Sequence, residues 1–197
     1  MTSRRDFLIL TFAASAAPLF SALAEESSPP DDQPLRFLME DVNGVIVTDE
    51  NLLGKFALIY FGYTGCPDIC PTSMLTMADA LAALGADAER VLPLFVTVDP
   101  DRDTAKLLSQ YVSAFDTRIV ALRGPKAYVD AMVKAYGAKY EFHFPDPADK
   151  TNYSVDHSAS MIFQGPDGRI VKRFPHGMAA AAIASEMQAA ITAAPVN

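Results

Sequence analysis

Apolar residues along the chain follow two alternating patterns. Continuous apolar runs at residues 56–61 (FALIYF) and 91–98 (VLPLFVTV) are typical of central strands buried on both faces of a sheet. Each run is followed by apolar positions close to helical spacing, at residues 70–84 and 104–115. The alternation continues with a strand at 118–122, a helix at 124–136 and an extended piece at 138–142. A hairpin of two strands at 159–164 and 169–174 and a closing helix at 179–193 follow.

A turn signal near the beginning of this pattern predicts a β-hairpin. Asn43-Gly44 suits the positive φ angles of a tight turn, and it lies between apolar segments at Leu35–Met39 and Val45–Val47. Strands interleaved with helices favour a central sheet with helices packed on its faces. The predicted fold is therefore α/β, with a mixed central sheet flanked by helices on both faces and an N-terminal β-hairpin.

The chain before this pattern has the features of an export segment. Residues 1–24 place Arg4 and Arg5 before an apolar run, which is typical of a cleavable signal peptide and resembles the twin-arginine type. Ordinary secretion and retention as a membrane anchor are the alternatives. Residues 25–34 (EESSPPDDQP) are polar and rich in proline, which indicates a flexible tether before a single domain at 35–197.

Composition and charge narrow the classes of function. The 197 residues are 50% hydrophobic and 20% charged, which is ordinary for a globular domain. Asp and Glu outnumber Lys and Arg by 24 to 16, and the formal net charge is −8. A protein of this sign does not gather phosphate backbones, so no nucleic-acid partner is expected. Two cysteines are too few for a disulfide framework.

The two cysteines, Cys66 and Cys70, lie four positions apart where a predicted strand passes into a predicted helix. Ligands gather beyond the carboxyl ends of strands in such sheets, and a helix N-terminus lowers a thiol pKa. This spacing allows either a disulfide or a soft cation held between two sulfurs. A thioredoxin-type redox pair has two residues between its thiols, and this pair has three, which favours metal.

Three histidines are available as a further ligand for a soft cation such as monovalent copper. His157 lies in the polar stretch 153–158 just before the apolar run 159–163, so we expect it at the top of a strand beside a flexible loop. Spacing alone does not decide whether His157 is a metal ligand or has a structural role. His143 and His176 are expected to be structural or exposed to solvent.

Eight methionines raise the alternative of thioether ligands for copper. Four of them lie among helix or strand residues, and we predict that they fill the core instead. These four are Met74, Met77, Met161 and Met187.

Three motifs in order resemble the Sco/SenC family. They are Cys66-Pro67-Asp68-Ile69-Cys70-Pro71 after an apolar strand, residues 96–104 (VTVDPDRDT) after the next, and residues 155–158 (VDHS) downstream. The resemblance implies a thioredoxin-like fold and a copper metallochaperone that serves assembly of cytochrome c oxidase, notably its binuclear copper centre. It places the metal ligands at Cys66, Cys70 and His157, with copper ion as the bound metal and a disulfide between the two thiols as an alternative state.

The resemblance also implies partners and supporting residues. The partners are the copper-bearing subunit of cytochrome c oxidase or another cuproprotein, together with a donor of thiol reducing equivalents. Asp99, Arg102 and Asp103 match a family signature, and we assign them a supporting role. The alternative for these three residues is a capped helix start with a local ion pair.

A second function class stays open for the two thiols. In a periplasmic thiol-disulfide reductase acting on cuproprotein cysteines, one thiolate attacks a partner disulfide and the other resolves the mixed intermediate. Loss of His157 would harm a three-ligand copper site but would be tolerated by a reductase. A peroxidase would need a peroxide pocket that the sequence does not show. The expected location is the periplasm, with the domain either free or anchored at the outer face of the inner membrane.

Overall fold

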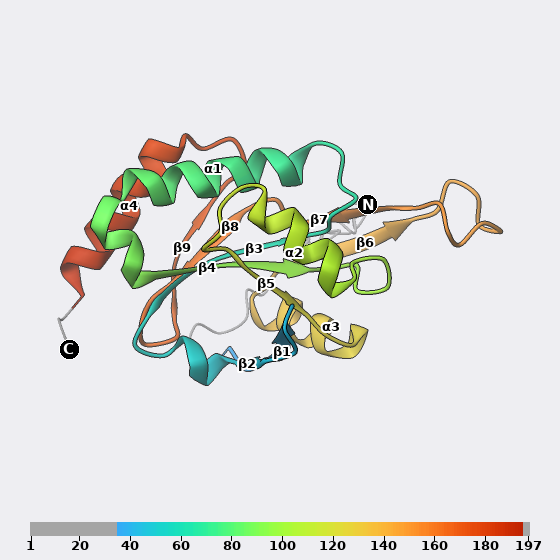
Figure 1. Ribbon diagram of the computed structural model, residues 1–197, viewed down its shortest axis with the longest axis horizontal. Helices are drawn as coiled ribbons and strands as arrows, with labels where there is room; N and C mark the ends of the chain where they lie inside the picture. Colours follow the sequence, from blue (N-terminus) through green and yellow to red (C-terminus); the bar gives the residue numbers. More distant parts are fainter. Residues whose placement is uncertain (1–34, 195–197) are drawn as a thin grey trace, which may run out of the picture.

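Seven strands form a mixed sheet at the centre of the protein, in the order β2–β1–β5–β4–β3–β8–β9 (Figure 1). Strands β3, β4 and β5 are parallel, whereas β1, β8 and β9 pair antiparallel with their neighbours. This confirms the predicted mixed sheet. The strands are β1 (Leu38–Asp41), β2 (Ile46–Thr48), β3 (Phe56–Gly62), β4 (Val91–Thr97), β5 (Val120–Arg123), β8 (Met161–Gln164) and β9 (Ile170–Phe174).

The structure is a computed structural model, and it describes residues 35–194. The expected export segment at 1–24 and the expected tether at 25–34 lie outside the described residues, as do residues 195–197.

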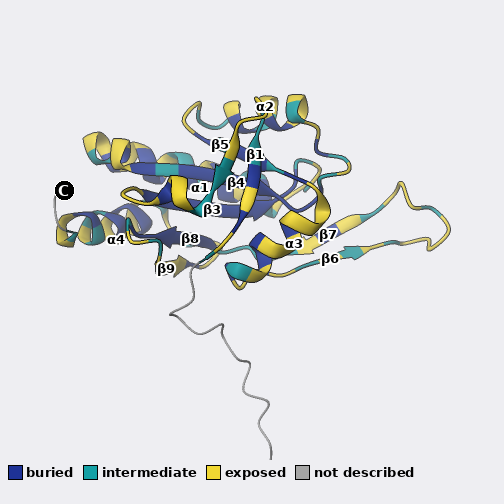
Figure 2. Cartoon of the chain, turned by 90° about the horizontal axis from the view of Figure 1, so that it is seen from below, coloured by how far each residue is buried: buried dark blue, intermediate teal, exposed yellow. Residues whose placement is uncertain are grey.

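All seven residues of strand β3 are buried (Figure 2). Successive side chains point to opposite faces of the sheet. Tyr60 contacts Phe95 of β4 on one face, whereas Phe61 contacts Tyr136 on the other. The sequence predicted a central strand covered on both faces, and the burial of β3 confirms it.

Four α-helices cover the sheet. Helices α1 (Ile69–Ala83) and α4 (Ala180–Ala193) lie side by side on one face, and α3 (Lys126–Ala135) lies on the opposite face (Figure 1). Helix α2 (Ala105–Ser113) begins after Thr104, whose hydroxyl accepts a hydrogen bond from the Leu107 N–H, as an N-cap residue does. None of the helices within residues 35–194 is long and apolar enough to cross a membrane.

The predicted helices are confirmed, with ends that differ by a few residues from the expected ones. The sequence pattern did not predict two short 3-10 helices, η1 (Asp49–Leu52) and η2 (Gly85–Arg90). Helices this short have too few residues to show a hydrophobic period.

The N-terminal hairpin of β1 and β2 is also confirmed, but its strands begin three and one residues later than predicted. Gly44 takes a positive φ of 78°, as the turn signal predicted, whereas Asn43, like every other non-glycine residue that the structure describes, does not. The Asp41 carboxylate accepts hydrogen bonds from the backbone N–H groups of Asn43 and Val45. These bonds hold the turn together and end β1 at Asp41.

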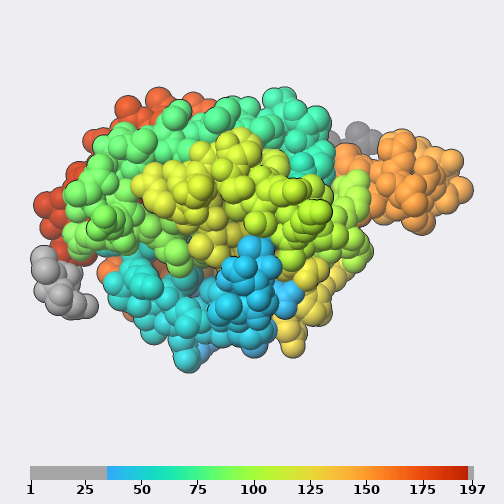
Figure 3. All heavy atoms as spheres, in the orientation of Figure 1, coloured from blue at the N-terminus to red at the C-terminus, as the bar shows by residue number. Residues whose placement is uncertain are grey.

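A second sheet of two strands corrects the expected position of His157. Strand β7 (Ser154–His157) pairs antiparallel with β6 (Tyr140–His143), with Tyr140 opposite His157. His157 therefore ends a strand of its own instead of lying at the top of the following strand beside a flexible loop. The sequence missed β7 because only one of its four residues is buried, so its apolar pattern is too weak. The hairpin projects from the body of the protein (Figure 3).

The four methionines assigned to the core are buried, which confirms that assignment. Met74, Met77 and Met187 are fully inaccessible and Met161 is 4% exposed. Unbranched thioether side chains fill irregular gaps well, here between α1, α4 and the sheet. They contribute apolar area to the core.

We expect Met77→Ala to lower the free energy of unfolding by about 2–5 kcal/mol, since truncating a buried side chain loses its transfer free energy and leaves a cavity. Urea denaturation of the purified protein measures this loss. Leu75→Ala on the same helix is the control, because Leu75 is 55% exposed and its truncation leaves no cavity. Equal losses in the two variants would contradict the packing described for α1.

Candidate metal centre

Two thiols and an imidazole meet where β3 passes into α1. Cys66, Cys70 and His157 each offer one ligand atom, and these atoms lie within 4.8 Å of one another. Cys70 Sγ is 3.1 Å from His157 Nε2. The structure thus brings together the three residues that the sequence singled out, although 87 positions separate Cys70 from His157.

Gly62, the last residue of β3, allows the close approach of Cys70. A Cβ atom at Gly62 would lie 2.9 Å from Cys70 Sγ and 3.0 Å from Cε2 of Phe95. Contacts this short are almost absent between real side chains, so a glycine is needed here for steric reasons. The first turn of α1 can therefore sit directly over the end of the strand.

The backbone around the thiols also orients Cys66. The Cys66 N–H donates to the carbonyl of Tyr63, which forms a tight turn before the motif. In the first turn of α1, the Cys70 N–H donates to Cys66 Sγ at 3.4 Å. Because the first N–H groups of a helix have no partner within the helix, a sulfur is a suitable acceptor for one of them. The two thiols are thereby held on the same side of the loop.

The two thiols differ in exposure. Cys70 is buried, Cys66 is half-buried, and both are free. Burial is the main cause that raises the pKa of the Cys70 thiol. The sequence predicted that the helix N-terminus would lower a thiol pKa, and for Cys70 this prediction is wrong because desolvation outweighs the helix. A bound cation would supply the charge that this sulfur needs to lose its proton.

His157 has the protonation state of a metal ligand. Its Nδ1 lies 3.2 Å from the carbonyl oxygen of Ser158. Because that oxygen only accepts, this contact favours the tautomer with the proton on Nδ1, in which the lone pair of Nε2 faces Cys70. Burial lowers the pKa of His157 below its ordinary value, which favours the neutral ring. A second hydrogen bond that fixes the ring and its tautomer is typical of histidine ligands.

Asp103 joins the thiol loop to the neighbouring strand. Its carboxylate accepts hydrogen bonds from the backbone N–H and the hydroxyl of Thr64, at 3.1 and 2.5 Å, and from the hydroxyl of Thr97 at 2.6 Å. Asp103 is 1% exposed, and burial raises its pKa more than these bonds lower it. The segment that precedes Cys66 is therefore attached to the end of β4.

Arg102 joins the loop after β4 to the hairpin that carries His157. Its Nε donates to the buried carboxylate of Asp99 at 2.5 Å, and its Nη1 donates to the carbonyl of Tyr153 at 2.9 Å. The guanidinium also lies 3.6 Å from the centre of the Tyr153 ring, a cation–π contact. The pair Asp99–Arg102 fits the alternative of a local ion pair. The contacts of Arg102 with Tyr153 reach beyond this ion pair and fix the start of β7.

Sequence reasoning did not identify the aromatic residues around the site. The rings of Tyr60 and Tyr63 meet His157 edge-on, with centroids 5.9 and 6.0 Å away. The Tyr63 hydroxyl accepts a hydrogen bond from the Val155 N–H in β7. No local signal in the apolar run 56–61 tells which of its side chains faces the site, because that depends on how α1 and β7 pack.

The other two histidines lie outside the cluster. His143 contacts the carboxylate of Asp156 across the hairpin, with 3.0 Å between Nε2 and the nearer oxygen. His176 Nδ1 is 3.1 Å from the hydroxyl of Ser73, a buried residue of α1. Each therefore has a local structural partner, as the sequence analysis expected.

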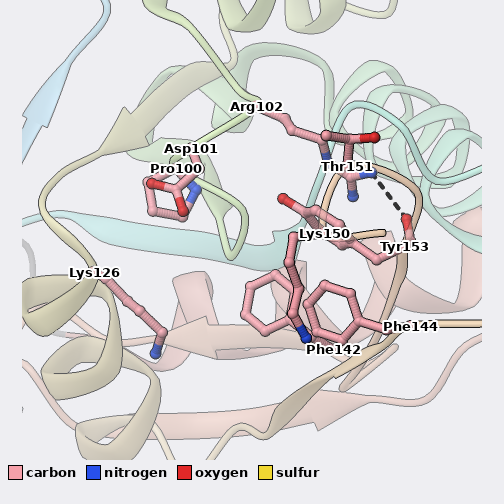
Figure 4. A pocket seen from close by; sticks show the side chains of 9 residues that line it. All are labelled: Pro100, Asp101, Arg102, Lys126, Phe142, Phe144, Lys150, Thr151 and Tyr153. Carbon is pink, nitrogen blue, oxygen red and sulfur yellow. Dashed lines mark hydrogen bonds between the residues drawn. The ribbon is translucent and has the colours of Figure 1, made fainter. Parts of the chain in front are cut away.

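A cavity of about 620 Å³ lies beside the site (Figure 4). Its walls are the loop after β4, the start of α3 and the projecting hairpin, and its lining residues are Pro100, Asp101, Arg102, Lys126, Phe142, Phe144, Lys150, Thr151 and Tyr153. None of the three candidate ligands lines it. The cavity shares Arg102 and Tyr153 with the network that positions the hairpin, so it is a neighbour of the metal centre and not part of it.

The fold and the cluster define a class of protein: a thioredoxin-like domain with two thiols and an imidazole converging at the carboxyl end of a central strand. A profile of the SCO1/SenC family matches residues 25–192. The chain belongs to this family.

Relatives and solved structures agree with that assignment. The chain is 36% identical to the mouse mitochondrial SCO1 homolog over 156 residues, which cover 78% of this chain and 54% of the relative. It is 35% identical to a SCO2-like protein of Rickettsia prowazekii over 138 residues, 70% of this chain and 67% of the relative. The chain thus spans about half the length of the mouse relative.

Two similar structures hold a metal. ScoI of Bradyrhizobium japonicum with copper bound is 36% identical, with a TM-score of 0.71 over 78% of this chain and 96% of that one. Yeast Sco1 with copper bound is 31% identical, with a TM-score of 0.72 over 81% of this chain and 88% of that one. These matches confirm the thioredoxin-like fold that the resemblance implied.

We expect Gly62→Ala to lower the free energy of unfolding by about 1–3 kcal/mol, because the added methyl group must displace the Cys70 sulfur or the Phe95 ring. Urea denaturation measures the loss. Gly65→Ala is the matched control, since a Cβ there would meet nothing nearer than the Tyr63 ring at 3.4 Å. If both variants lose the same stability, the close approach at Gly62 is wrong.

The stability of the metal-free protein should fall on acidification because of His157. The pKa of its folded state is lowered below the ordinary value of about 6.5, so folding favours the neutral ring. The corresponding stability is present above that value and is lost as the pH falls through the folded pKa. Melting temperatures recorded from about pH 7.5 to pH 5 should therefore fall more steeply for the wild type than for His157→Gln. His143→Gln, at an exposed position, should keep the wild-type slope; a flat wild-type profile would contradict this prediction.

Proposed function

We propose that this protein is a copper metallochaperone that binds copper at Cys66, Cys70 and His157 and delivers it during assembly of cytochrome c oxidase, to the binuclear copper centre. The observation that carries the proposal is the convergence of these three ligand atoms within 4.8 Å. Family membership and the copper-bound relatives support it.

The chemistry of the three side chains favours copper over other metals. Two thiolates and a neutral imidazole are soft or borderline ligands, which suit monovalent copper. Structural zinc sites need four ligands, and among residues 35–194 no fourth histidine, cysteine or carboxylate joins the cluster. Calcium and magnesium require oxygen ligands, which are absent from this set. Copper binding would release the proton of the buried Cys70 thiol.

Delivery requires that the ligands can be exchanged with those of a partner. Cys66 lies in a half-buried loop before α1, and His157 ends a hairpin that projects from the body. A partner's ligands can therefore replace Cys66 and His157 while the buried Cys70 still holds the ion. The partner we propose is the copper-bearing subunit of cytochrome c oxidase or another cuproprotein.

The proposed location and domain limits follow from the sequence. We propose that residues 1–24 direct export, that 25–34 form a tether, and that the domain at 35–197 works in the periplasm. A cycle between thiols and a Cys66–Cys70 disulfide would then need a dedicated reductant, because that compartment is oxidising.

A thiol-disulfide reductase is the second candidate, because two free thiols lie together and one of them is accessible. The Cys66 thiolate would attack a partner disulfide, forming a mixed disulfide and releasing one partner thiolate. The Cys70 thiolate would then attack Cys66, closing a disulfide and releasing the second partner thiol. This reaction needs both cysteines but no imidazole ligand.

Copper titration of the reduced protein separates the two candidates. We expect a single copper ion per chain, with affinity measured against a competing chelator. Cys66→Ser, Cys70→Ser and His157→Ala should each weaken binding by more than the roughly 10- to 100-fold typical of a change beside a metal site, since each removes a ligand. His176→Ala is the control, because its ring lies outside the cluster.

The reductase assay uses the same variants with a disulfide-containing cuproprotein peptide as substrate. Weak copper binding that does not respond to His157→Ala, together with reduction that depends only on the two cysteines, would overturn the metallochaperone proposal in favour of the reductase.

A further inference from the structure

The cavity beside the metal centre contains a group of aromatic side chains that the proposed copper site does not use. Phe142, Phe144 and Tyr153 line it, and their ring centroids lie 5.2, 5.3 and 6.3 Å from one another. All three residues are half-buried and belong to the projecting hairpin (Figure 3). The cavity volume of about 620 Å³ falls within the range of roughly 300–1,000 Å³ that binding pockets have. Aromatic residues in such a hollow are typical of the centre of a protein–protein interface.

Positive side chains surround these rings, although the chain as a whole is acidic. Arg102, Lys126 and Lys150 line the cavity, and Asp101 is the only carboxylate among its described lining residues. The formal net charge of the chain is −8. The lining is therefore opposite in sign to the protein as a whole, and it favours a negatively charged guest.

Lys150 is the cation that is available to such a guest. Arg102 and Lys126 already form ion pairs with aspartates that do not line the cavity. The ammonium of Lys150 lies 4.5 Å from the centre of the Phe144 ring (Figure 4), and no carboxylate within residues 35–194 is paired with it. The two aspartates at the tip of the hairpin accept hydrogen bonds from N–H groups of their own turns.

The contacts of the rings narrow the chemistry of the guest. The guanidinium of Arg102 lies 3.6 Å from the centre of the Tyr153 ring, and Lys150 occupies the face of Phe144. A cationic guest would meet like charge on the faces that it needs. A small inorganic anion would leave the aromatic surface in contact with water. The guest that satisfies both the rings and the charge is an aromatic or large aliphatic side chain with a carboxylate beside it.

A series of contacts leads from this cavity to the metal centre. The Arg102 guanidinium contacts two tyrosine rings, because it lies 3.6 Å from the centre of Tyr153 and 5.6 Å from that of Tyr63. The Tyr63 ring in turn meets His157 edge-on, with 6.0 Å between the centroids. A protein bound in the cavity therefore lies close to the ligand that ends the hairpin.

We propose that this cavity is the docking site for an acidic segment of the protein that accepts copper. An aromatic or aliphatic side chain of the partner packs against Phe142, Phe144 and Tyr153, and a neighbouring carboxylate pairs with Lys150. This inference rests on the proposed function, because it names the partner by its role in copper delivery. Docking here holds the partner beside His157 during ligand exchange, which raises the effective concentration of its copper ligands.

Peptides of defined composition test the recognition itself. The probe is acetyl-Ser-Asp-Phe-Glu-Ser-amide. In one comparison peptide alanine replaces the phenylalanine, and in another asparagine and glutamine replace the two acidic residues. Binding to the purified protein is measured from the NMR shifts of the backbone amides of Thr151 and Tyr153. We expect the probe to bind more tightly than either comparison peptide, because only the probe provides both an aromatic ring and negative charge.

Phe144→Ala and Lys150→Ala should weaken binding of the probe. Loss of the aromatic contact should lower the affinity about two- to tenfold. Loss of an exposed ion pair should lower it about two- to fivefold, and less at high salt. The matched controls are Leu53→Ala and Lys55→Ala, since both residues are exposed and lie before β3, at the opposite end of that strand from the metal centre. They should keep the wild-type affinity.

Copper transfer tests the identity of the partner. The copper(I)-loaded protein is mixed with the soluble copper-bearing domain of a cytochrome c oxidase subunit, and the transfer rate is recorded below saturation. Phe144→Ala and Lys150→Ala should slow transfer by the same factors by which they weaken peptide binding. Their copper(I) affinity should stay at the wild-type value, because neither residue belongs to the ligand cluster. That unchanged affinity also shows that the variants are folded.

Each contrary result has a distinct meaning. Equal binding of the three peptides, or equal losses in the two controls, would overturn the inference. Self-association of the wild type that Phe144→Ala abolishes in analytical ultracentrifugation would also overturn it, because a second copy of this chain would then be the occupant. A wild type that binds no copper would reject the proposed function, and the identification of the partner with it. Normal copper transfer by variants that have lost peptide binding would reject the inference alone.

Discussion

The contact between Cys70 and the end of β3 is the constraint on which the rest of the site depends. Because Gly62 has no side chain, the first turn of α1 lies directly on the strand and Cys70 is buried at its start. That position gives the sulfur an apolar environment, which opposes its ionisation. It also fixes where Nε2 of His157 must lie to contact the Cys70 sulfur. It likewise fixes the direction from which Cys66 Sγ accepts the hydrogen bond of the Cys70 N–H.

Two side chains connect this contact to the rest of the molecule by different routes. Asp103 attaches the loop before Cys66 to β4, so the thiol loop moves with the central sheet. Arg102 attaches the residue before β7 to Asp99, so the strand that carries His157 begins at a fixed point. Both side chains come from the single loop after β4. One short segment therefore fixes the positions of both the thiols and the imidazole, although these groups are far apart in the chain.

Much of the fold could be predicted because its main strands and helices have long periodic patterns. The runs at 56–61 and 91–98 were recognisable as buried strands, and the turn at Asn43-Gly44 was recognisable from its conformational requirement. Strand β7 was not recognisable, since only one of its four residues is buried and it therefore has no clear apolar pattern. The candidate ligands could be recognised because cysteine and histidine are rare in this chain and lie within its motifs. Tyr60 could not be recognised as a neighbour of the site, because it lies in an apolar run whose side chains alternate between the two faces of the sheet.

The separate pairing of β6 with β7 has a consequence for the lifetime of a bound ion. Within residues 35–194 these two strands pair with each other and with no strand of the main sheet, so a tilt of the arm that carries His157 would break side-chain contacts such as that of Val155 with Tyr63 but no strand pairing of the main sheet. An ion that loses the imidazole in this way would keep two sulfur ligands, a coordination that soft monovalent copper accepts. Partial release and full release would thus be separate events with separate rates. Under the proposed function, loss of the imidazole alone would leave the ion on the two sulfurs until a partner's ligands replace them.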